Sequence, residues 1–300
     1  MLMKKFYLSL LGAMLAMTAG AQDYYAQNGA LLDSTYSVGA DGARMSKTIC
    51  EYDAKGNITV EYTYDYTGGK EQLSMKSEAE YDDQGRCVKT VNYEYQNGEF
   101  VLYGYEEMSD FDSEGRATVI IEYGTDEENP SAGIQPEAKT VVKKYNQLAM
   151  EDVELYSWSG SDWQLYSTNH SDFNDQGLPI KTTSTMSMMG MTFTNTVTME
   201  YDDHGQVLRS ETSSGFGVNT TQEYENSYDA DGNLIKQTCK TMGIETTMFL
   251  FWSKGGSAGI GRVQAADGST VYYDLNGRRL NGKPQQKGLY IRNGKKVMIR

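Results

Sequence analysis

The chain has few of the residues that staple small exported proteins or hold metals. It contains 3 cysteines, 2 histidines and 4 prolines in 300 residues. Cys50, Cys87 and Cys239 are odd in number and far apart, which argues against a dense disulfide scaffold and predicts free thiols in strands. Neither the cysteines nor the histidines show the ligand spacing of a zinc site, so we expect no metal and no other cofactor.

Long apolar runs are also missing beyond the N-terminus. The chain begins MLMKKFYLSLLGAMLAMTAGAQ, in which two lysines precede an apolar run and the triplet Ala19-Gly20-Ala21. This order is typical of a secretory signal, which predicts a signal peptide over residues 1–21 and an exported chain. A membrane anchor is the alternative, but the run is shorter than the ~20 apolar residues that a spanning helix needs. We expect no membrane span in the mature chain.

Charge is divided unevenly along the chain. Residues 22–261 carry 16 basic and 39 acidic side chains, a net charge of −23, whereas residues 262–300 carry nine basic and two acidic ones, a net charge of +7. The contrast predicts a main domain over 22–254, a linker over the glycine-rich residues 255–261, and a C-terminal module over 262–300. An acidic body repels phosphates, so nucleic acid is not an expected partner. No helix pattern follows GGSAGIG, which therefore does not fit a phosphate loop.

A short motif, an aromatic residue followed by Asp and, three residues later, Gly, recurs about every 29 residues. The copies are YDAKGN, YDDQGR, FDSEGR, FNDQGL (with Asn for Asp), YDDHGQ and YDADGN, and a decayed copy falls at Tyr145. We expect the Asp carboxylate to accept backbone N–H groups and the Gly to adopt a positive φ. The residues predicted to form these turns are Tyr52, Asp53, Gly56, Tyr81, Asp82, Gly85, Phe111, Asp112, Gly115, Tyr201, Asp202, Gly205, Tyr228, Asp229 and Gly232.

A second set of glycine-containing turns lies midway between these motifs, at TGGK, QNGE, SGSD, MMGM, SGFG and MGIE. Each repeat is therefore predicted to contain two strands and two turns. The intervening segments alternate apolar and polar residues: Leu73, Met75, Ser77, Ala79 and Tyr81 are expected on one face. Ile58, Val60, Tyr62 and Tyr64 are likewise expected to share a face. The predicted fold is all-β: an open, curved or spiralling antiparallel meander of about 12 strands that covers its Tyr/Met/Val face, plus a small C-terminal β module.

The copy YDADGN also has the alternating oxygens of a calcium loop, in Asp229, Asp231 and Asn233. A calcium-binding EF-hand loop needs a glycine at its sixth place and a glutamate at its twelfth. Counted from Asp229, those places hold Leu234 and Lys240. We therefore interpret the motif as a structural turn.

Catalytic constellations are not evident in the sequence. His204 occupies a variable position of a repeat turn, and His170 has no nucleophile motif beside it. Acidic pairs such as Glu106-Glu107, 126–128 and Asp202-Asp203 are common in so acidic a chain, and most are expected to be solvated. We expect no catalytic residues and no enzyme activity.

Aromatic residues give the strongest indication of binding, since the chain has 23 tyrosines and 3 tryptophans. Most of the rings are expected to pack on the sheet. Trp158 and Trp163 differ because they flank a predicted hairpin tip in SWSGSDW, and they are the candidate ligand-binding residues. The expected function is a non-catalytic structural or interaction role, with binding of a carbohydrate or another surface ligand as the alternative.

The spaced YDxxGN/R motifs resemble the YD repeats of Rhs-like proteins, and still more the short YD-type repeat proteins that Bacteroidetes secrete. The resemblance covers roughly residues 52–239 and rests most on the copies at Tyr52, Tyr81 and Tyr228. It implies a curved β sheet or shell. The repeats are too few for the large enclosing shell of Rhs proteins, so toxin encapsulation is not implied.

The C-terminal segment VYYDLNGRRLNGKPQQKGLYIRNGKKVMIR predicts three short strands separated by turns. It is similar to the C-terminal sorting domains of the type IX secretion system of Bacteroidetes, and the matching residues are Tyr273, Asp274, Leu275, Gly277, Arg278, Gly288, Leu289, Tyr290, Ile291, Gly294, Lys295, Lys296 and Val297. The resemblance implies passage through the outer-membrane secretion machinery to the cell surface or the medium. If the tail is only a terminal β module, the protein is expected in the periplasm.

Overall fold

The computed structural model describes residues 25–125, 133–147, 149–188 and 190–254, and the backbone of four short strands between residues 272 and 299. The chain divides into two compact units, residues 1–256 and 257–300. The predicted signal peptide and the linker at 255–261 lie outside the described residues. No helix within the described ranges is long and apolar enough to cross a membrane.

The first unit consists of antiparallel strands joined in chain order. They are β1 (Ala26–Gln27), β2 (Ala30–Gly39), β3 (Arg44–Tyr52), β4 (Ile58–Thr67), β5 (Lys70–Tyr81), β6 (Cys87–Gln96), β7 (Glu99–Phe111), β8 (Ala117–Thr125), β9 (Ile134–Asn146), β10 (Ala149–Trp158), β11 (Trp163–Phe173), β12 (Pro179–Met188), β13 (Met191–Tyr201), β14 (Val207–Ser213), β15 (Asn219–Tyr228), β16 (Leu234–Thr241) and β17 (Ile244–Lys254).

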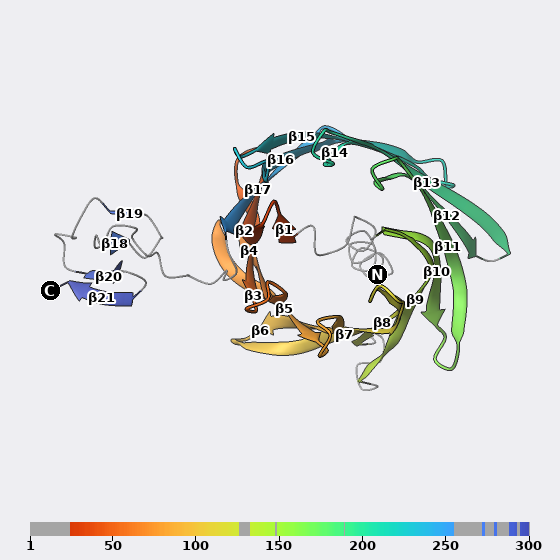
Figure 1. Cartoon of the computed structure of the whole chain (residues 1–300), viewed down its shortest axis with the longest axis horizontal. Helices are drawn as coiled ribbons and strands as arrows, with labels where there is room; N and C mark the ends of the chain where they lie inside the picture. Colours follow the sequence, from red (N-terminus) through yellow and green to blue (C-terminus); the bar gives the residue numbers. More distant parts are fainter. Residues whose placement is uncertain are drawn as a thin grey trace. The chain divides into compact units, whose positions relative to one another are not determined.

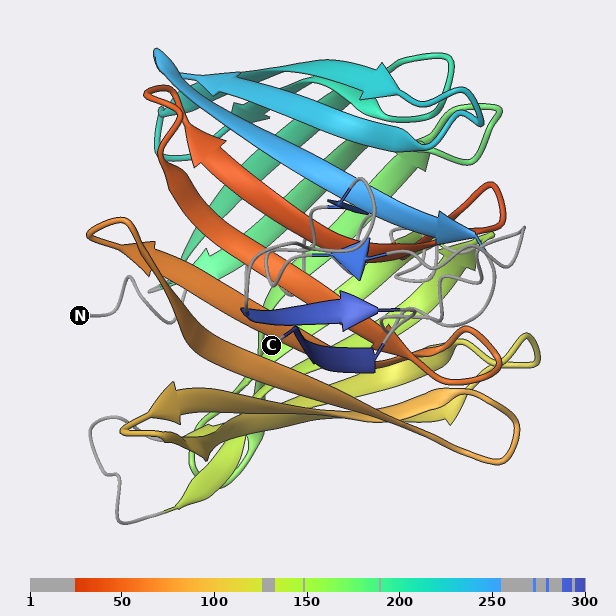
Figure 2. The same cartoon turned by 90° about the vertical axis from the view of Figure 1, so that its left-hand side faces the viewer.

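The sheet closes on itself into a barrel of sixteen strands, β2 to β17, and β1 adds to the inner side of β2 (Figure 1). Closure is made by β17 and β2, which pair from Thr246↔Gly39 to Lys254↔Ala30. Figure 2 shows the strands running obliquely around the wall, as closure of a twisted sheet requires. The expected open meander of about 12 strands is therefore wrong in its closure and its strand number. The expected strand number is too low because the repeat motif covers only residues 52–239, whereas the paired strands of the barrel extend from residue 30 to residue 254.

The repeat turns have the predicted chemistry. In the copy at Tyr81, the Asp82 N–H donates to the Arg86 carbonyl at 3.0 Å and the Gly85 N–H to the Asp82 carbonyl at 2.9 Å. Asp82 Oδ1 accepts the backbone N–H groups of Gln84 and Arg86, both at 2.9 Å. Gly85 has φ 80°. The same backbone pattern recurs at Asp53, Asp112, Asn174, Asp202 and Asp229.

YDADGN follows this pattern too, which supports the structural interpretation of its acidic residues. Asp229 Oδ1 accepts the N–H groups of Asp231 and Asn233, and Asp229 Oδ2 accepts the Asn233 amide at 2.9 Å. Asn233 is buried and accepts a further bond from Asn28 Nδ2 at 3.3 Å. The oxygens of Asp229 are thus engaged by the turn itself.

In several copies the anchoring aromatic residue is a tyrosine whose hydroxyl ties its repeat to the one before it. The Tyr81 hydroxyl donates to the Ile58 carbonyl at 2.7 Å, and the Tyr201 hydroxyl to the Pro179 carbonyl at 2.6 Å. The decayed copy keeps this contact, because the Tyr145 hydroxyl donates to the Ala117 carbonyl. The register also shifts at the aromatic residue, for example between Glu51 and Tyr52, so a β-bulge marks the end of the strand.

These bulges decide which side chains face inward. Tyr25, next to the inner strand β1, packs against a buried cluster of Leu32, Cys50, Leu234 and Leu250, so the Cys50 face is the inner one (Figure 1). Cys50 pairs with Glu61, and Glu61 with Ser77, which places all three on that face.

Two sequence predictions about the faces are wrong for the same reason. Val60 and Tyr62 pair with Glu78 and Lys76 on the outer face, whereas Ile58 packs against the inner cluster, because the bulge skips Thr59. Likewise Leu73 pairs with Tyr64 on the outer face while Met75 pairs with Thr63 on the inner one, because the register skips Ser74. The strands therefore do not present one continuous Tyr/Met/Val face.

The inner face is mostly polar. Its buried side chains include Ser167, Asn169, Ser171, Thr182 and Ser210, and the Ser171 and Thr182 hydroxyls bond each other at 3.0 Å. Aromatic and charged residues are abundant on the outer face, where Lys76 Nζ lies 4.4 Å from the ring centre of Tyr93 and 4.6 Å from that of Phe100. The three cysteines are free, and Cys50 is the buried one.

The second unit is a small sheet of β18 (Tyr272–Tyr273), β19 (Arg279–Leu280), β20 (Gly288–Arg292) and β21 (Lys295–Ile299) in the order β19-β18-β20-β21. It has four described strands where the sequence predicts three. β20 and β21 form a hairpin from Gly288↔Ile299 to Arg292↔Lys295. Of the sorting-like positions, 274, 275, 277, 278 and 294 lie outside the described residues, and the others fall in strands β18, β20 and β21.

Candidate functional site

The candidate site lies on the outer face of β9 to β12, and the two predicted tryptophans form one end of it. Trp158 ends β10 and Trp163 begins β11, and the two residues pair directly across the hairpin. Their rings meet edge to face, with centres 5.1 Å apart and planes inclined by 61°. Both rings are only partly buried. The hairpin turn thus makes one aromatic surface from two residues that the sequence separates by five positions.

A lysine lies beside this pair. Lys139 Nζ, from β9, is 4.5 Å from the ring centre of Tyr156 and 4.9 Å from that of Trp163. The contact follows from the register, because Lys139 pairs with Tyr156. A cation over aromatic faces is attracted by the ring quadrupoles. The aromatic surface therefore carries a positive charge at its edge.

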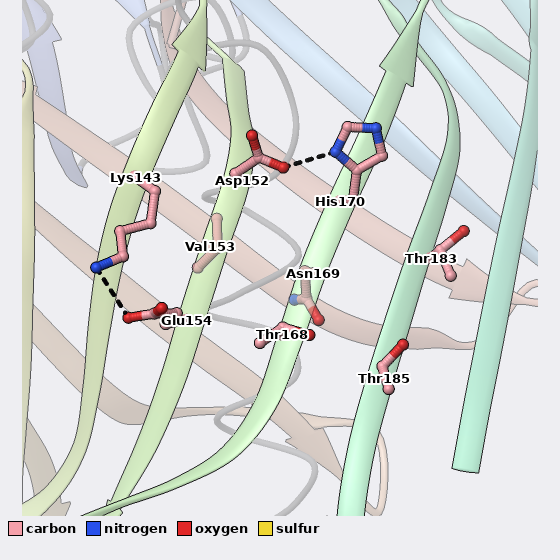
Figure 3. Close-up of a pocket in the computed structure, with 9 residues that line it drawn as sticks. All are labelled: Lys143, Asp152, Val153, Glu154, Thr168, Asn169, His170, Thr183 and Thr185. Carbon is pink, nitrogen blue, oxygen red and sulfur yellow. Dashed lines mark hydrogen bonds and ion pairs between the residues drawn. The ribbon is translucent and has the colours of Figure 1, made fainter. Parts of the chain in front are cut away.

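A shallow groove of about 260 Å³ lies further along the same outer face, on β9 to β12. Figure 3 shows its charged groups, Lys143, Asp152, Glu154 and His170, projecting from neighbouring strands, with Thr183 and Thr185 on the next strand. The Lys143 Nζ and a Glu154 carboxylate oxygen are 3.1 Å apart. Hydrogen bonds from the Tyr156 hydroxyl and then from Lys143 lower the pKa of Glu154.

His170 is the centre of a second polar cluster in the groove. Its Nδ1 lies 2.6 Å from Asp152 Oδ1, and its Nε2 lies 3.4 Å from Asp172 Oδ1. The hydrogen bond with Asp152 is the largest cause that raises the pKa of His170. The sequence prediction missed this cluster because Asp152 and His170 are 18 positions apart and become neighbours only through the β10–β11 register.

The other histidine and the acidic pairs that were considered as catalytic candidates lie outside this groove. The ring of His204 stacks on that of Tyr228 with centres 3.9 Å apart, inside a repeat turn. Glu106 and Glu107 point to opposite faces, since Glu106 pairs with Glu122 and Glu107 with Ile121. Asp202 accepts a hydrogen bond from Asn226 at 2.9 Å and another from the Tyr228 hydroxyl. The acidic run at 126–128 lies outside the described residues.

Comparison with known proteins does not assign a family. No protein-family model and no curated protein matches the chain. A porin-like protein from Bacteroides uniformis is 10% identical over 74% of this chain and 98% of its own, with a TM-score of 0.46. A porin-like protein from Bacteroides vulgatus is 8% identical with the same coverages and a TM-score of 0.37. The Tc holotoxin pore of Photorhabdus luminescens is 8% identical over 87% of this chain and 18% of its own, with a TM-score of 0.20. Similarity at this level carries no functional conclusion.

Proposed function

We propose that the protein is an exported, non-catalytic β-barrel that binds carbohydrate, or a chemically similar surface ligand, on the outer face of β9 to β12. The observation that supports this most is the Trp158–Trp163 pair, which lies on the same outer face of β10 and β11 as the polar groove. Indole rings offer large flat surfaces for the C–H faces of sugar rings. The threonine hydroxyls, the carboxylates and Lys143 of the groove supply hydrogen-bond partners for sugar hydroxyls.

The pairing of the charged groups supports binding over catalysis. Lys143 is neutralised by Glu154, and His170 lies between Asp152 and Asp172. More than 40% of the surface of the His170 and Asp152 side chains is exposed. Closure of an active site expels water and strengthens the electrostatic interactions inside it, and this open face shows no such closure.

The outer wall supports a location in water. It carries cross-strand ion pairs such as Lys47–Glu71 at 3.1 Å and Lys89–Glu107 at 3.3 Å. A wall that faces lipid presents an apolar band instead, because each lysine or arginine near the bilayer centre costs about 2–4 kcal/mol. We infer that this barrel acts at the cell surface or in the medium without inserting into the bilayer.

Glycan binding is tested by titrating the purified protein with the hits of a glycan array. Trp158→Ala and Trp163→Ala should each weaken binding at least about tenfold, or about 1.4 kcal/mol. Phe251→Ala is the matched control, because Phe251 is an exposed aromatic residue of β17, stacked on Tyr36 and remote from the groove. An empty array, or hits that survive both tryptophan substitutions, would favour a purely structural role.

Export through the C-terminal module is a separate proposal. Deletion of residues 288–300 removes β20 and β21, the hairpin that contains most of the sorting-like residues. If the module is a sorting signal, the surface or extracellular fraction should fall and the protein should accumulate in the periplasm. Unchanged surface display would leave the module as a terminal β unit without a sorting role.

A further inference from the structure

A β-bulge brings two consecutive carboxylates to the same place beside His170. In the pairing of β10 with β9, Met150 is opposite Tyr145, Asp152 opposite Lys144 and Val153 opposite Val142. The register therefore skips Glu151 on β10. In a regular strand Glu151 and Asp152 would point to opposite faces, but a bulge redirects its side chains. A ligand atom from each of Glu151, Asp152 and His170 lies within 4.8 Å of the others.

We propose that Glu151, Asp152 and His170 form a binding site for a divalent transition-metal ion of the zinc type. One imidazole nitrogen and two carboxylate oxygens are a donor set that suits Zn²⁺. Nδ1 is the coordinating nitrogen, because it is the ring atom that faces Asp152. The site shares the groove of the proposed glycan binding, but metal binding does not depend on that proposal, because it is measured without any sugar.

The surroundings of His170 provide a second observation that points to a metal. Its other nitrogen, Nε2, lies 3.4 Å from Asp172 Oδ1. A histidine that ligates a metal usually donates its remaining N–H to a carboxylate, which fixes the tautomer and the ring orientation. Asp172, on the same outer face of β11, occupies that place. Metal binding replaces the hydrogen bond between Nδ1 and Asp152, and the remaining imidazole proton, on Nε2, faces Asp172.

The charges around the cluster allow a cation to enter. Lys144, from β9, pairs with Glu151, but more than half of its side chain is exposed and it can move into solvent. Lys143 is held by Glu154 on the other side of the groove. Asp152 and His170 line that groove, so three protein ligands leave coordination positions open to water or to a hydroxyl group.

The site predicts a definite pH dependence. The groups that face His170 are Glu151 and Asp152 on β10 and Asp172 on β11, with Lys144 on β9 beside Glu151 and the uncharged Thr183 opposite on β12. A proton on Nδ1 competes with the metal. Binding should therefore strengthen as pH rises through the titration of His170 and become constant above it.

Titration calorimetry with ZnCl₂ and NMR of the imidazole resonances test the site together. The chain has only two histidines, so the resonances are easily assigned. One equivalent of Zn²⁺ should shift the His170 signals and leave those of His204 in place. His170→Ala and Asp152→Asn should each weaken binding at least tenfold, and Asp172→Asn should weaken it about 10- to 100-fold.

His204→Gln is the matched control and should bind Zn²⁺ like the unmodified protein, as should folded protein whose accessible thiols are alkylated. Thermal unfolding of each variant confirms that it is folded, which the exposure of these side chains favours. Binding that survives His170→Ala, that follows the thiols, or that Ca²⁺ reproduces with equal strength would overturn the proposal and indicate association with an acidic surface only.

Discussion

At the residue scale, one side-chain oxygen organises each repeat turn described above, and in all but one of these turns it belongs to an aspartate. Asp82 accepts two backbone N–H groups through Oδ1 and the Arg86 guanidinium through Oδ2 at 2.7 Å. These bonds, first from the Arg86 backbone and then from its side chain, lower the pKa of Asp82. In another copy Asn174 replaces the aspartate, and there the residue in the place of Arg86 is Leu178, which has no side-chain donor.

Asp82→Ala should lower the midpoint of thermal unfolding, and Asp82→Asn should lower it less, because the amide oxygen still accepts both N–H groups as Asn174 does. A carboxyl with a depressed pKa contributes stability above its ordinary pKa and loses it as pH falls through the depressed one. The difference in the midpoint of thermal unfolding between the natural protein and Asp82→Ala should therefore be largest at neutral pH and should decrease below about pH 4. If the difference in midpoint between the two proteins stays the same across this pH range, the Asp82 carboxylate does not stabilise the turn as described.

Tyr81→Phe removes the hydroxyl that donates to the Ile58 carbonyl and keeps the ring. The expected loss in the free energy of unfolding is about 1 kcal/mol, since one neutral hydrogen bond is removed and a partly buried carbonyl loses its partner. Urea denaturation measures it. Tyr95→Phe, at a tyrosine of the outer face with 37% of its surface exposed, is the control and should change little.

At the element scale, β7 and β8 place acidic groups together on the polar inner face. Glu106 and Glu122 are directly opposite each other. Burial first, and then the charges of Glu106 and Glu137, raise the pKa of Glu122 to about 7. Gly104 and Gly124 form the next pair on the same face, two residues along the strands, and a Cβ on Gly104 would be 2.4 Å from the Tyr123 carbonyl oxygen. Glycine at this position therefore permits the close approach of the two strands.

Glu122→Gln should stabilise the protein at alkaline pH. A raised carboxyl pKa means that the folded state holds the proton more tightly than the unfolded one, so the stability is present below about pH 4.5 and is lost as pH rises to about 7. A shift of this size corresponds to about 1–3 kcal/mol at pH 8. Urea unfolding at pH 4 and pH 8 measures it, and the variant should differ from the natural protein only at the higher pH.

Glu107→Gln is the matched control for this prediction. Glu107 is next to Glu106 in sequence, but it lies on the outer face, paired with Lys89. Its substitution should give no gain in stability at pH 8. An equal gain from both variants would indicate a general effect of net charge instead of the inner cluster.

At the scale of the whole first unit, closure removes the free edges of the sheet. An unpaired edge presents N–H and C=O groups to other chains and promotes aggregation. In the barrel, β17 pairs with both β16 and β2, and its residues Leu250 and Trp252 belong to the buried cluster and to the residues packed against it. The Trp252 Nε1–H donates to the Leu234 carbonyl at 2.7 Å.

A chain that ends at residue 241 lacks β17 and should unfold or associate, because it opens two edges and removes part of the cluster. A chain that ends at residue 256 keeps all sixteen barrel strands and should remain folded, with the same oligomeric state as the complete chain. Size-exclusion chromatography with light scattering and far-UV circular dichroism distinguish the two outcomes. A stable monomer ending at residue 241 would show that closure is not required.

The sequence predicts local features well because neighbouring residues determine them. The turn at Tyr81 is specified within six positions, by an aspartate that accepts N–H groups and a glycine with positive φ. The hairpin predicted at SGSD is confirmed, since Trp158 pairs with Trp163 across it. The all-β antiparallel class follows from these turns and the alternation between them.

Only the tertiary structure decided that the sheet closes, which side chains face inward and which residues line the groove. Closure depends on the twist that accumulates over many strands. The sequence of a single repeat does not determine that total twist. Bulges that skip Thr59, Ser74 and Glu151 reverse or redirect side chains in ways that a period of two does not predict. His170 meets Asp152 only through the register of β10 and β11. By itself, then, the sequence determined the turns and strands of each repeat, because short-range hydrogen bonds and backbone φ set them. Which faces the barrel encloses and which side chains it brings together depend on contacts between strands, and only the closed structure contains them.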